Sequence, residues 1–422
     1  MPYITIPISP KQHQVSFEDI MFGDDEDIFR PIKDTYDTKT VWRDITPQAL
    51  LEKLDVQDLI NTLKKYNEQF SDIVAAESKE YLYRFFSIPK ASGGLRPIAA
   101  PEERLSDALH QLKNIFEIKF STFYRPAGYK INTLYHTCAM AYIKNRSVIT
   151  AVERHRNNES KWFLKTDLHN FFGSINIDFA MKMLGMIYPF SEVVKSSEGK
   201  DELRKAISTA FLNNGLPQGT PFSPMFTNIV MIPIDHAIAK MCRENSPFLI
   251  YTRYADDMFI SSRYEFEDRE LIFKIHDKGK LYSKTNSESL KNQLDEMIEK
   301  TNIPRKIHDI FRRIGAPFEL SYKKTSYGNT NGSNWMLGVQ INKDNEITLG
   351  AQKRNLLRVD IYNFTKDYLN GKPWSPVEAM ELQGRISWHR SVNKEDTDKI
   401  LKKYSNKFHK DISLMLKNVI SG

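Results

Sequence analysis

Two adjacent acidic residues interrupt an apolar stretch of the sequence, YTRYADDMFISS, at residues 251–262. Residues 251–254 and 258–262 are rich in aromatic and branched side chains, a composition typical of β-strands. The pattern therefore predicts a hairpin whose turn holds Asp256 and Asp257. Two like charges repel each other and are costly to bury, so the fold has to balance them.

A bound divalent cation would provide that balance. An acid pair on rigid backbone offers the hard oxygen ligands that Mg²⁺ requires, and the charge of the ion makes adjacent carboxylates favourable. A second ion needs another carboxylate, and Asp167, which ends the apolar strand KWFLKTD, is the best candidate. Two ions about 4 Å apart form the arrangement that nucleotidyl transfer needs. By itself an Asp-Asp pair is more often an ordinary turn, so the interpretation depends on the neighbouring motifs.

The charges are unevenly distributed along the chain, whose net charge is +7. The first 80 residues have an acidic excess and residues 351–422 a basic one. A basic body suggests a polyanion as partner, although a merely soluble basic protein has the same composition. There is no run of about 18 apolar residues and no secretory leader, and Cys138 and Cys242 are the only cysteines. These features predict a cytoplasmic protein without a membrane partner.

Helices and short strands are mixed without an internal repeat, which indicates the α+β class and not a doubly wound parallel sheet. Residues 1–45 look irregular, and Thr46 and Asp55 are suited to cap two short helices. The periodicity predicts three C-terminal helices, at residues 352–370, 376–391 and 395–418.

Two further segments have less regular patterns. Residues 263–310 are highly charged, and their first part could be a loop, whereas residues 287–300 have helical periodicity. The apolar segment NWMLGVQIN, residues 334–342, reads as a strand.

In their order and content, several motifs resemble those of the reverse transcriptase family. The segments LKTDLHNFFGSIN, GLPQGTPFSP and YADD are similar to its first three palm motifs, and LSYKKTS to the fourth. SIPKASGGLRPI is similar to the finger motifs, WMLGVQIN to the primer grip and AMELQGRISWHRSVN to a thumb helix. The resemblance covers about residues 80–420. It implies a right-hand fold of fingers, palm and thumb, and RNA-templated DNA synthesis.

The resemblance also suggests domain boundaries. They are an acidic N-terminal extension at 1–75, fingers at 76–160, a palm with the catalytic motifs at 161–262, a charged insertion at 263–310, the palm end with the primer grip at 311–350, and a basic helical thumb at 351–422.

The resemblance implies a two-metal catalytic site. Asp167 and Asp256 are expected to bind two Mg²⁺ ions, for which Mn²⁺ could substitute, with Asp257 in a supporting role. The backbone carbonyl of Leu168 could complete one of the two sites.

Several residues are candidates for binding the incoming nucleotide. Phe172 lies five residues after Asp167, where the family places a steric gate that excludes a ribose 2′-OH. The alternative is that Phe171 and Phe172 are both core residues, and one of them surely is. In the loop that should cover the nucleotide, Gly219 allows close backbone approach and Gln218 offers amide hydrogen bonds.

Three cations are candidates for the triphosphate. Lys90 and Arg96 flank the Gly93-Gly94 turn, where they could fold onto the phosphates or simply be solvated. Lys324 is expected near the leaving pyrophosphate, although its neighbour Lys323 competes for the role.

Contacts with nucleic acid are expected in two places. Tyr254 and Arg253 precede the acid pair; Arg253 could be a solvated strand residue or touch the primer. The basic thumb suits the backbone of an RNA–DNA duplex, although it could be a plainly solvated face. The clustered lysines are Lys399, Lys402, Lys403, Lys407 and Lys410.

The subclass is less well determined by the motifs. The chain resembles stand-alone bacterial reverse transcriptases, either retron-like or defence-associated of the class 2 kind. AYIKNRSVITAVERH is similar to a retron signature, but Thr150 replaces its Asn and His155 is one residue late. We expect dNTPs as substrates and a partner noncoding RNA as template, used in antiphage defence. The N-terminal arm and the insertion could bind that RNA, or the insertion could be a disordered loop.

Three alternatives stay open at this point. One is a retron enzyme that makes RNA-linked DNA, and another is a template-independent deoxynucleotidyl transferase of the abortive-infection type. The third is a noncatalytic RNA-binding scaffold.

Overall fold

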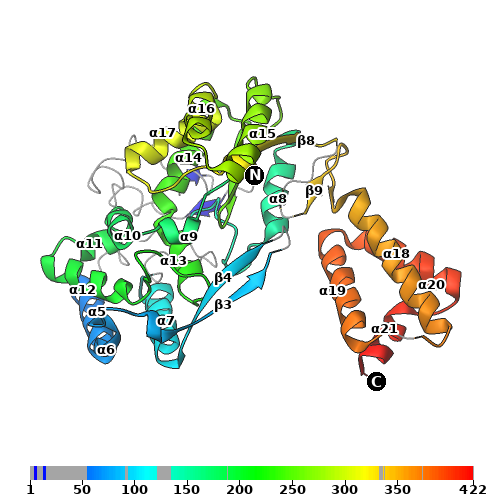
Figure 1. Cartoon of the computed structure of the whole chain (residues 1–422), viewed down its shortest axis with the longest axis horizontal. Helices are drawn as coiled ribbons and strands as arrows, with labels where there is room; N and C mark the ends of the chain where they lie inside the picture. The colour runs from blue at the N-terminus through cyan, green and yellow to red at the C-terminus, as the bar shows by residue number, and fades with distance from the viewer. Residues whose placement is uncertain are drawn as a thin grey trace. The chain divides into compact units, whose positions relative to one another are not determined.

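The computed structural model describes residues 4–6, 13–15, 55–90, 94–120, 135–187, 189–331, 336, 338–372 and 374–421, the first two segments as backbone only. These residues form two compact units (Figure 1). Unit 1 comprises Met1–Arg146, Thr166–Met258 and Asp268–Ser326, and unit 2 comprises Ser147–Lys165, Phe259–Glu267 and Tyr327–Gly422.

A four-stranded sheet carries the predicted acids, with strand order β6-β7-β5-β8. Its strands are β5 (Trp162–Asp167), β6 (Ile250–Tyr254), β7 (Asp257–Ser262) and β8 (Ser326–Asn329). The amide of Leu168 donates to the carbonyl of Asp256 at 3.0 Å, and that of Lys161 to Ser262 at 2.9 Å. Pairing in this opposite order makes β5 and β7 antiparallel, so the end of β5 lies beside the start of β7.

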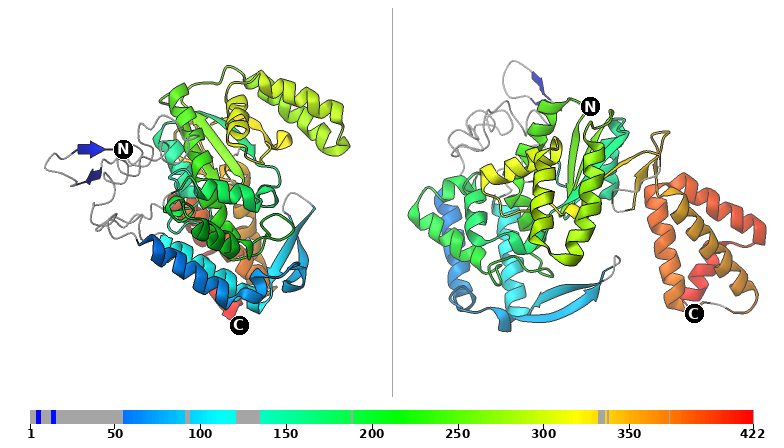
Figure 2. Two further views of the ribbon diagram at one scale, coloured as in Figure 1. Left: turned by 90° about the vertical axis from the view of Figure 1, so that its left-hand side faces the viewer. Right: turned by 45° about the horizontal axis from the view of Figure 1, so that its top comes forward.

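A second hairpin, β3 (Tyr83–Pro89) with β4 (Leu95–Pro101), projects as a long ribbon (Figure 2). Its antiparallel register runs from the pair Tyr83 and Pro101 to the pair Pro89 and Leu95. The elements around it in the chain are α5 (Val56–Gln69), α6 (Ser71–Val74), η1 (Glu80–Leu82), α7 (Glu103–Asn114) and the π-helical η2 (Ile115–Phe120). As predicted, Asp55 caps α5, accepting from the Asp58 amide at 3.0 Å.

The core of unit 1 is strongly aromatic. Phe116 lies 5.1 Å from Phe190 and 5.3 Å from Phe222 between ring centroids, and all three rings are fully buried. Apolar burial on this scale is the main source of fold stability. The helices between β5 and β6 are α9 (Phe171–Ser174), α10 (Ile177–Leu184), α11 (Phe190–Val193), α12 (Ser197–Ser208), α13 (Ser223–Val230) and α14 (Ile232–Asn245).

The charged segment after β7 is helical, which corrects the expected loop in its first part. It forms α15 (Arg269–Thr285), α16 (Glu288–Glu299) and α17 (Ile303–Ile314), followed by the short turn η4 (Tyr322–Lys324). In α15 the buried residues Ile272, Ile275 and Gly279 recur at helical spacing. Only this narrow stripe is buried. Exposed apolar residues such as Phe273 and Leu281, together with the surrounding charges, obscured its period in the sequence.

Unit 2 contains α8 (Val148–Asn157), the short strands β9 (Gln340–Ile341) and β10 (Ile347–Thr348), and four C-terminal helices. These helices are α18 (Gly350–Leu369), α19 (Pro376–Val392), α20 (Lys394–Phe408) and α21 (Ile412–Ser421). Their shared core consists of Leu357, Ile361, Phe364, Ala379, Leu382, Ile386, Ile400, Ile412, Met415 and Leu416.

Two expectations for unit 2 are corrected. The single helix expected at 395–418 is divided, because His409 adopts a left-handed φ of 52° and Asp411 accepts from the Ser413 amide at 2.9 Å. The strand expected at 334–342 is reduced to β9 and a bridge between Met336 and Val339, with the other residues of the segment either in a turn or outside the described part.

The mixture of helices and short antiparallel sheets confirms the α+β class. Near the N-terminus, which looked irregular, β1 (Ile4–Ile6) pairs antiparallel with β2 (His13–Val15), in keeping with the strand preference of branched residues. Thr46 lies outside the described residues. Among the helices that are described, none has the length and apolar character to cross a membrane.

Candidate active site

Asp167 lies at the end of β5 with only 3% of its surface exposed. The Nζ atom of Lys324 donates to its Oδ2 at 2.6 Å. Burial raises the pKa of Asp167 to about 7, because the charged form is desolvated. Lys324 acts in the opposite direction, whereas Asp256 and Asp257 raise the pKa further. The three predicted acids therefore share one electrostatic environment.

Asp256 and Asp257 lie at the turn of the β6–β7 hairpin and are half-buried. The preceding residue, Ala255, has a φ of 57°, in the left-handed region that residues with a Cβ seldom adopt. The hydrogen bond from Leu168 to the Asp256 carbonyl fastens this turn to the end of β5. The hairpin thus presents its acids at the same end of the sheet as Asp167, where β5 ends and β7 begins.

The chemistry of this donor set fits a divalent cation. Carboxylate oxygens are the ligands that Mg²⁺ prefers, and three of them on adjacent strands give a concentrated negative charge. That charge is met in part by the ammonium of Lys324. Burial lowers the pKa of Lys324, but the contact with Asp167 and the charges of Asp256 and Asp257 together raise it overall. The carbonyl of Leu168 stays a predicted additional ligand.

The structure distinguishes Lys324 from Lys323. Lys324 forms an ion pair with Asp167, and among the described residues Lys323 forms none with this acid, although both lysines are exposed. The turn η4 that carries both is packed against α15. A Cβ added to Gly279 of α15 would lie 2.5 Å from the backbone nitrogen of Lys323, so the backbones are in direct contact.

His276, one turn before Gly279, faces the same turn. Burial lowers its pKa, while the backbone groups of Lys323 and Thr325 beside it act to raise it. The insertion therefore supports the segment that places Lys324, a role that the sequence did not indicate.

Phe171 and Phe172 have different environments. Phe171 is 3% exposed, and its ring lies 5.7 Å from that of Phe318, so it is the core residue of the pair. Phe172 is half-buried, and its carbonyl accepts from the Leu216 amide at 3.0 Å. Its gate function stays a prediction, but its ring is not part of the closed core.

The loop with Gln218 and Gly219 is joined to β4. The carbonyl of Gln218 accepts from the Ala99 amide at 2.9 Å. Gly219 has a φ of 111°, and a Cβ there would lie 2.6 Å from Cγ2 of Ile98. The close approach that requires glycine is thus to β4, and binding of a nucleotide by this loop stays a prediction.

Lys90 and Arg96 are exposed on the β3–β4 hairpin. The amide of Lys90 donates to the Gly94 carbonyl at 3.0 Å, and Gly94 has a φ of 81°. Gly93 lies outside the described residues. Neither cation belongs to the buried part of the site, so their contact with phosphates stays a prediction.

The prediction for Arg253 was wrong in both of its forms. Its side chain is completely buried and pairs with Asp235, so it is neither solvated nor available to a primer. Tyr254, beside it, is half-buried. The signal that could have revealed the pair was Asp235 itself, a single acid within the apolar helical segment MIPIDHAIAKM.

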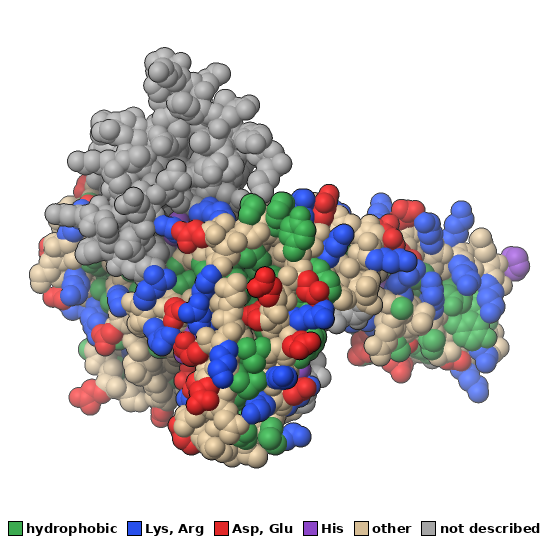
Figure 3. All heavy atoms as spheres, turned by 90° about the horizontal axis from the view of Figure 1, so that it is seen from above, with side chains coloured by type: hydrophobic (Ala, Val, Ile, Leu, Met, Phe, Trp, Pro, Cys, Tyr) green, Lys and Arg blue, Asp and Glu red, His purple; other side chains and the backbone are tan. Residues whose placement is uncertain are grey.

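The five predicted thumb lysines are all exposed. In Figure 3 the part at the right, which is made of the C-terminal helices, displays blue Lys and Arg side chains beside a green apolar group. Lys399 is paired with Glu395 at 2.6 Å, and Lys407 lies 4.7 Å from the ring centroid of Tyr362. Lys402, Lys403 and Lys410 share this exposed character, and their contact with a duplex stays a prediction.

A shallow hollow of about 410 Å³ on α19 was missed by the sequence reasoning. It is lined by Glu381, Gly384, Arg385 and Trp388. Trp388 is 39% exposed, and a Cβ at Gly384 would meet no atom within 4 Å. An open strip of helix beside an exposed aromatic ring is a surface suited to contact with another molecule.

Comparisons with known proteins point to one family. Residues 88–293 match the family described as reverse transcriptase (RNA-dependent DNA polymerase). Retron Ec83 reverse transcriptase of Escherichia coli is 25% identical over 360 residues, which cover 84% of this chain and 97% of the relative. Retron Ec73 reverse transcriptase of the same species is 23% identical over 76% of this chain and 86% of the relative.

Among solved structures, a telomerase from Candida albicans in complex with a fragment of telomeric RNA aligns with a TM-score of 0.41 and 11% identity. The alignment covers 81% of this chain and 61% of the telomerase chain. Such a score is too low to identify a fold by itself.

Proposed function

We propose that this chain is an RNA-directed DNA polymerase with the right-hand fold, similar to retron reverse transcriptases, and that it copies a partner noncoding RNA into DNA at the end of the β6-β7-β5-β8 sheet that carries the acids. The observation that carries the choice of site is the contact of Lys324 with the buried Asp167, next to the turn that holds Asp256 and Asp257. The domain boundaries given above are part of this proposal.

Reverse transcriptases generally use divalent metal ions, and Asp167 and Asp256 would hold two Mg²⁺ ions here. Asp257 would support them electrostatically, and the Leu168 carbonyl could serve as a further ligand to one of them. When bound, the ions supply activation of the primer hydroxyl and stabilisation of the leaving oxygen. The rigid attachment of the turn to β5 keeps the carboxylates in place for that chemistry.

Selection and orientation of the dNTP fall to side chains around the acids. The ring of Phe172 excludes a ribose 2′-OH, and Gln218 and Gly219 cover the nucleotide. Lys90 and Arg96 neutralise the triphosphate from the exposed hairpin. We expect Lys324, an ammonium that contacts Asp167, to lie near the leaving pyrophosphate, to which it could donate a proton.

The nucleic acid is held mainly through its backbone. The exposed thumb lysines suit the phosphates of an RNA–DNA duplex, and we expect Tyr254, which is half-buried, to contact the primer end. Sequence similarity to the retron Ec83 reverse transcriptase over 97% of its length favours a second candidate, synthesis of DNA that stays linked to RNA. A role in antiphage defence and a cytoplasmic location stay predictions.

Primer extension tests this function directly. Purified protein with Mg²⁺, dNTPs and a primed RNA should extend the primer with the sequence complementary to the template. Asp256→Asn should reduce the rate at least about 1000-fold with an unchanged melting temperature, because it removes a metal ligand but not the side-chain shape. Asp277→Asn, which changes an exposed acid on α15, is the matched control and should retain the rate.

Three outcomes would contradict the proposal. Retained activity in Asp256→Asn would exclude the acid site. Products unrelated to the template would indicate a template-independent transferase, and RNA binding without any synthesis would indicate a scaffold. Phe172→Ala should admit ribonucleotides, and unchanged sugar selection would exclude the gate.

A further inference from the structure

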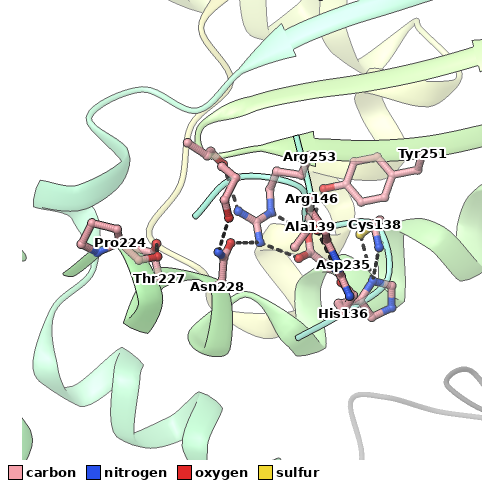
Figure 4. Close-up of polar contacts among 12 residues, drawn as sticks. His136, Cys138, Ala139, Arg146, Pro224, Thr227, Asn228, Asp235, Tyr251 and Arg253 are labelled. Carbon is pink, nitrogen blue, oxygen red and sulfur yellow. Dashed lines mark hydrogen bonds and ion pairs between the residues drawn. The ribbon is translucent and has the colours of Figure 1, made fainter. Parts of the chain in front are cut away.

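Arg253 carries a guanidinium group that is completely enclosed by protein. Its Nε donates to Oδ1 of Asp235 at 2.8 Å, and its Nη2 donates to Oδ2 at 2.7 Å (Figure 4). Asp235, on α14, is also fully buried. This is a two-point ion pair in which the charges of both partners are matched.

The remaining donors of the guanidinium reach two further groups. Nη2 also donates to Oδ1 of Asn228 on α13 at 3.2 Å. Nη1 donates to the carbonyl of Ala255 at 3.0 Å. Ala255 has the left-handed φ of 57° and immediately precedes Asp256, so Arg253 holds the peptide that enters the metal-binding turn.

The same strand position is fixed from its other side. The amide of Arg253 donates to the Cys138 carbonyl at 2.8 Å, and the Met140 amide donates to the Arg253 carbonyl at 2.8 Å. Asn228 in turn donates to the carbonyl of Ala141 at 2.7 Å. The guanidinium therefore ties the catalytic hairpin to α13 and α14, while the Arg253 backbone ties it to residues 138–141.

A metal site is the competing interpretation of this cluster. Within the described part of the chain, His136, Cys138 and Asp235 have potential ligand atoms within 4.8 Å of one another. However, both oxygens of Asp235 accept from Arg253, and Oδ1 also accepts from the Tyr251 hydroxyl at 2.9 Å. A cation here would face the buried guanidinium, and like charges repel strongly in such an environment.

Stability alone does not account for the pair. Buried ion pairs can often be replaced by apolar side chains without loss of stability, because desolvation offsets their attraction. The planar fork of arginine instead fixes direction, since each N–H points at a set angle. A residue that binds a carboxylate and a strained turn through different N–H groups is suited to hold that turn in one geometry.

We propose that Arg253 is a positioning residue for polymerisation, which sets the place of Asp256 by holding the Ala255 carbonyl against α13 and α14. This inference rests on the proposed function of Asp256 as a metal ligand. It assigns Asp235 and Asn228 to the same task. Both act through Arg253, because they contact its guanidinium, and the guanidinium contacts the turn.

The test is Arg253→Lys, measured by steady-state primer extension on a primed RNA over a range of Mg²⁺ concentrations. Lysine keeps a charge for Asp235, but its N–H donors all lie on one nitrogen, so it cannot span Asp235 and the Ala255 carbonyl as the guanidinium does. We expect kcat to fall at least about tenfold and the Mg²⁺ concentration for half-maximal rate to rise several-fold, since small displacements of catalytic groups are costly. The KM for dNTP should stay within about twofold, because this residue does not touch the nucleotide.

Tyr251→Phe is the matched control, because it removes a hydrogen bond to the same Asp235 without touching the turn. It should keep kcat and the Mg²⁺ requirement within about twofold of the parent. Equal losses in both variants, or no change in Arg253→Lys, would overturn the inference. Asp256→Asn in the same assay separates the two proposals, because its inactivity upholds the metal site even if Arg253→Lys has no effect.

If Arg253→Lys does not fold, Asn228→Ala decides the question. It removes one acceptor of the guanidinium and keeps the ion pair with Asp235. We expect a smaller loss of kcat, about threefold, with the same increase in the Mg²⁺ requirement. An unchanged Mg²⁺ requirement in this variant would overturn the inference.

Discussion

The two antiparallel hairpins β6–β7 and β3–β4 have opposite surroundings. In β6–β7 the central side chains are buried, including Tyr251, Met258 and the guanidinium of Arg253. In β3–β4 the pattern is reversed: Phe85 is 57% exposed and Leu95 63% exposed. The backbone pairing of the two hairpins is thus similar, but the side chains of β6–β7 are packed on their sides, whereas those of β3–β4 are largely exposed.

The difference separates two tasks. A hairpin that is enclosed on its sides can hold a strained turn and a pair of acids at fixed positions, because its neighbours leave no room for movement. A hairpin with exposed aromatic and basic side chains has its contacting groups available to another molecule. The β6–β7 and β3–β4 hairpins therefore differ less in their backbone pairing than in their burial.

The largest expected effect concerns stability. Met258→Ala should lower the free energy of unfolding by about 2–5 kcal/mol, because it leaves a cavity at a fully buried position. Ile88→Ala on β3, where the side chain is 40% exposed, should cost much less. Urea unfolding of the two variants measures both quantities, and similar losses would show that β3–β4 is covered in solution.

The second effect sharpens the description of the enclosed site. Asp167 has a pKa of about 7, so its carboxyl is largely protonated at pH 6 and must lose the proton to bind a cation. We expect Mg²⁺ binding, followed by titration calorimetry, to be about tenfold weaker at pH 6 than at pH 8. Affinity that is constant over this range would contradict a raised pKa.

The same shift has a consequence for the metal-free protein. A raised carboxyl pKa means that the folded state retains a proton that the unfolded chain releases. The corresponding contribution to stability is fully present below about pH 4 and is lost as the pH rises through about 7. Asp167→Asn should remove this pH dependence from thermal unfolding curves.

The third effect concerns the exposed ribbon. Arg96→Ala should raise the KM for dNTP a few-fold with kcat little changed, because it removes a uniform contact with the triphosphate. Arg84→Ala on the same hairpin is the matched control; its guanidinium lies 5.8 Å from the Phe86 ring centroid, and its loss should leave the KM unchanged. Equal effects of both variants would mean that the ribbon contributes only general positive charge.

The smallest effect is expected for Phe85→Ser. The ring is already 57% exposed, so its removal should change the free energy of unfolding by no more than about 0.5 kcal/mol. Urea unfolding beside the parent protein measures it. A loss approaching that of Met258→Ala would remove the contrast between the hairpins.

The sequence predicted those parts of the fold and site that depend on neighbours along the chain. The acids at 256 and 257 follow from the turn between two apolar runs, and the core position of one phenylalanine at 171–172 follows from an aromatic pair after a buried strand. The division of the last predicted helix depended on a left-handed φ at His409, which residue type alone does not determine.

The burial of Arg253 could not be predicted from its strand, because it depends on an acid 18 residues earlier on a helix. Likewise, nothing local to Lys324 indicates that a helix from the insertion packs behind it. Such features depend on contacts between segments that are distant in the sequence. In a single sequence, the only sign of such a contact is a residue that does not fit its surroundings, such as one acid in an apolar helix.

The direct backbone contact between α15 and η4 has a consequence for engineering and for evolutionary change. At Gly279 there is no space for a side chain, so the two segments can only vary together. A shortened enzyme made by replacing residues 269–299 with a brief linker would lose the surface that supports Lys323 and Lys324. Helices α15 and α16 therefore cannot be removed without effect on the site. Evolutionary changes in their length would require compensating changes in the turn at 322–325.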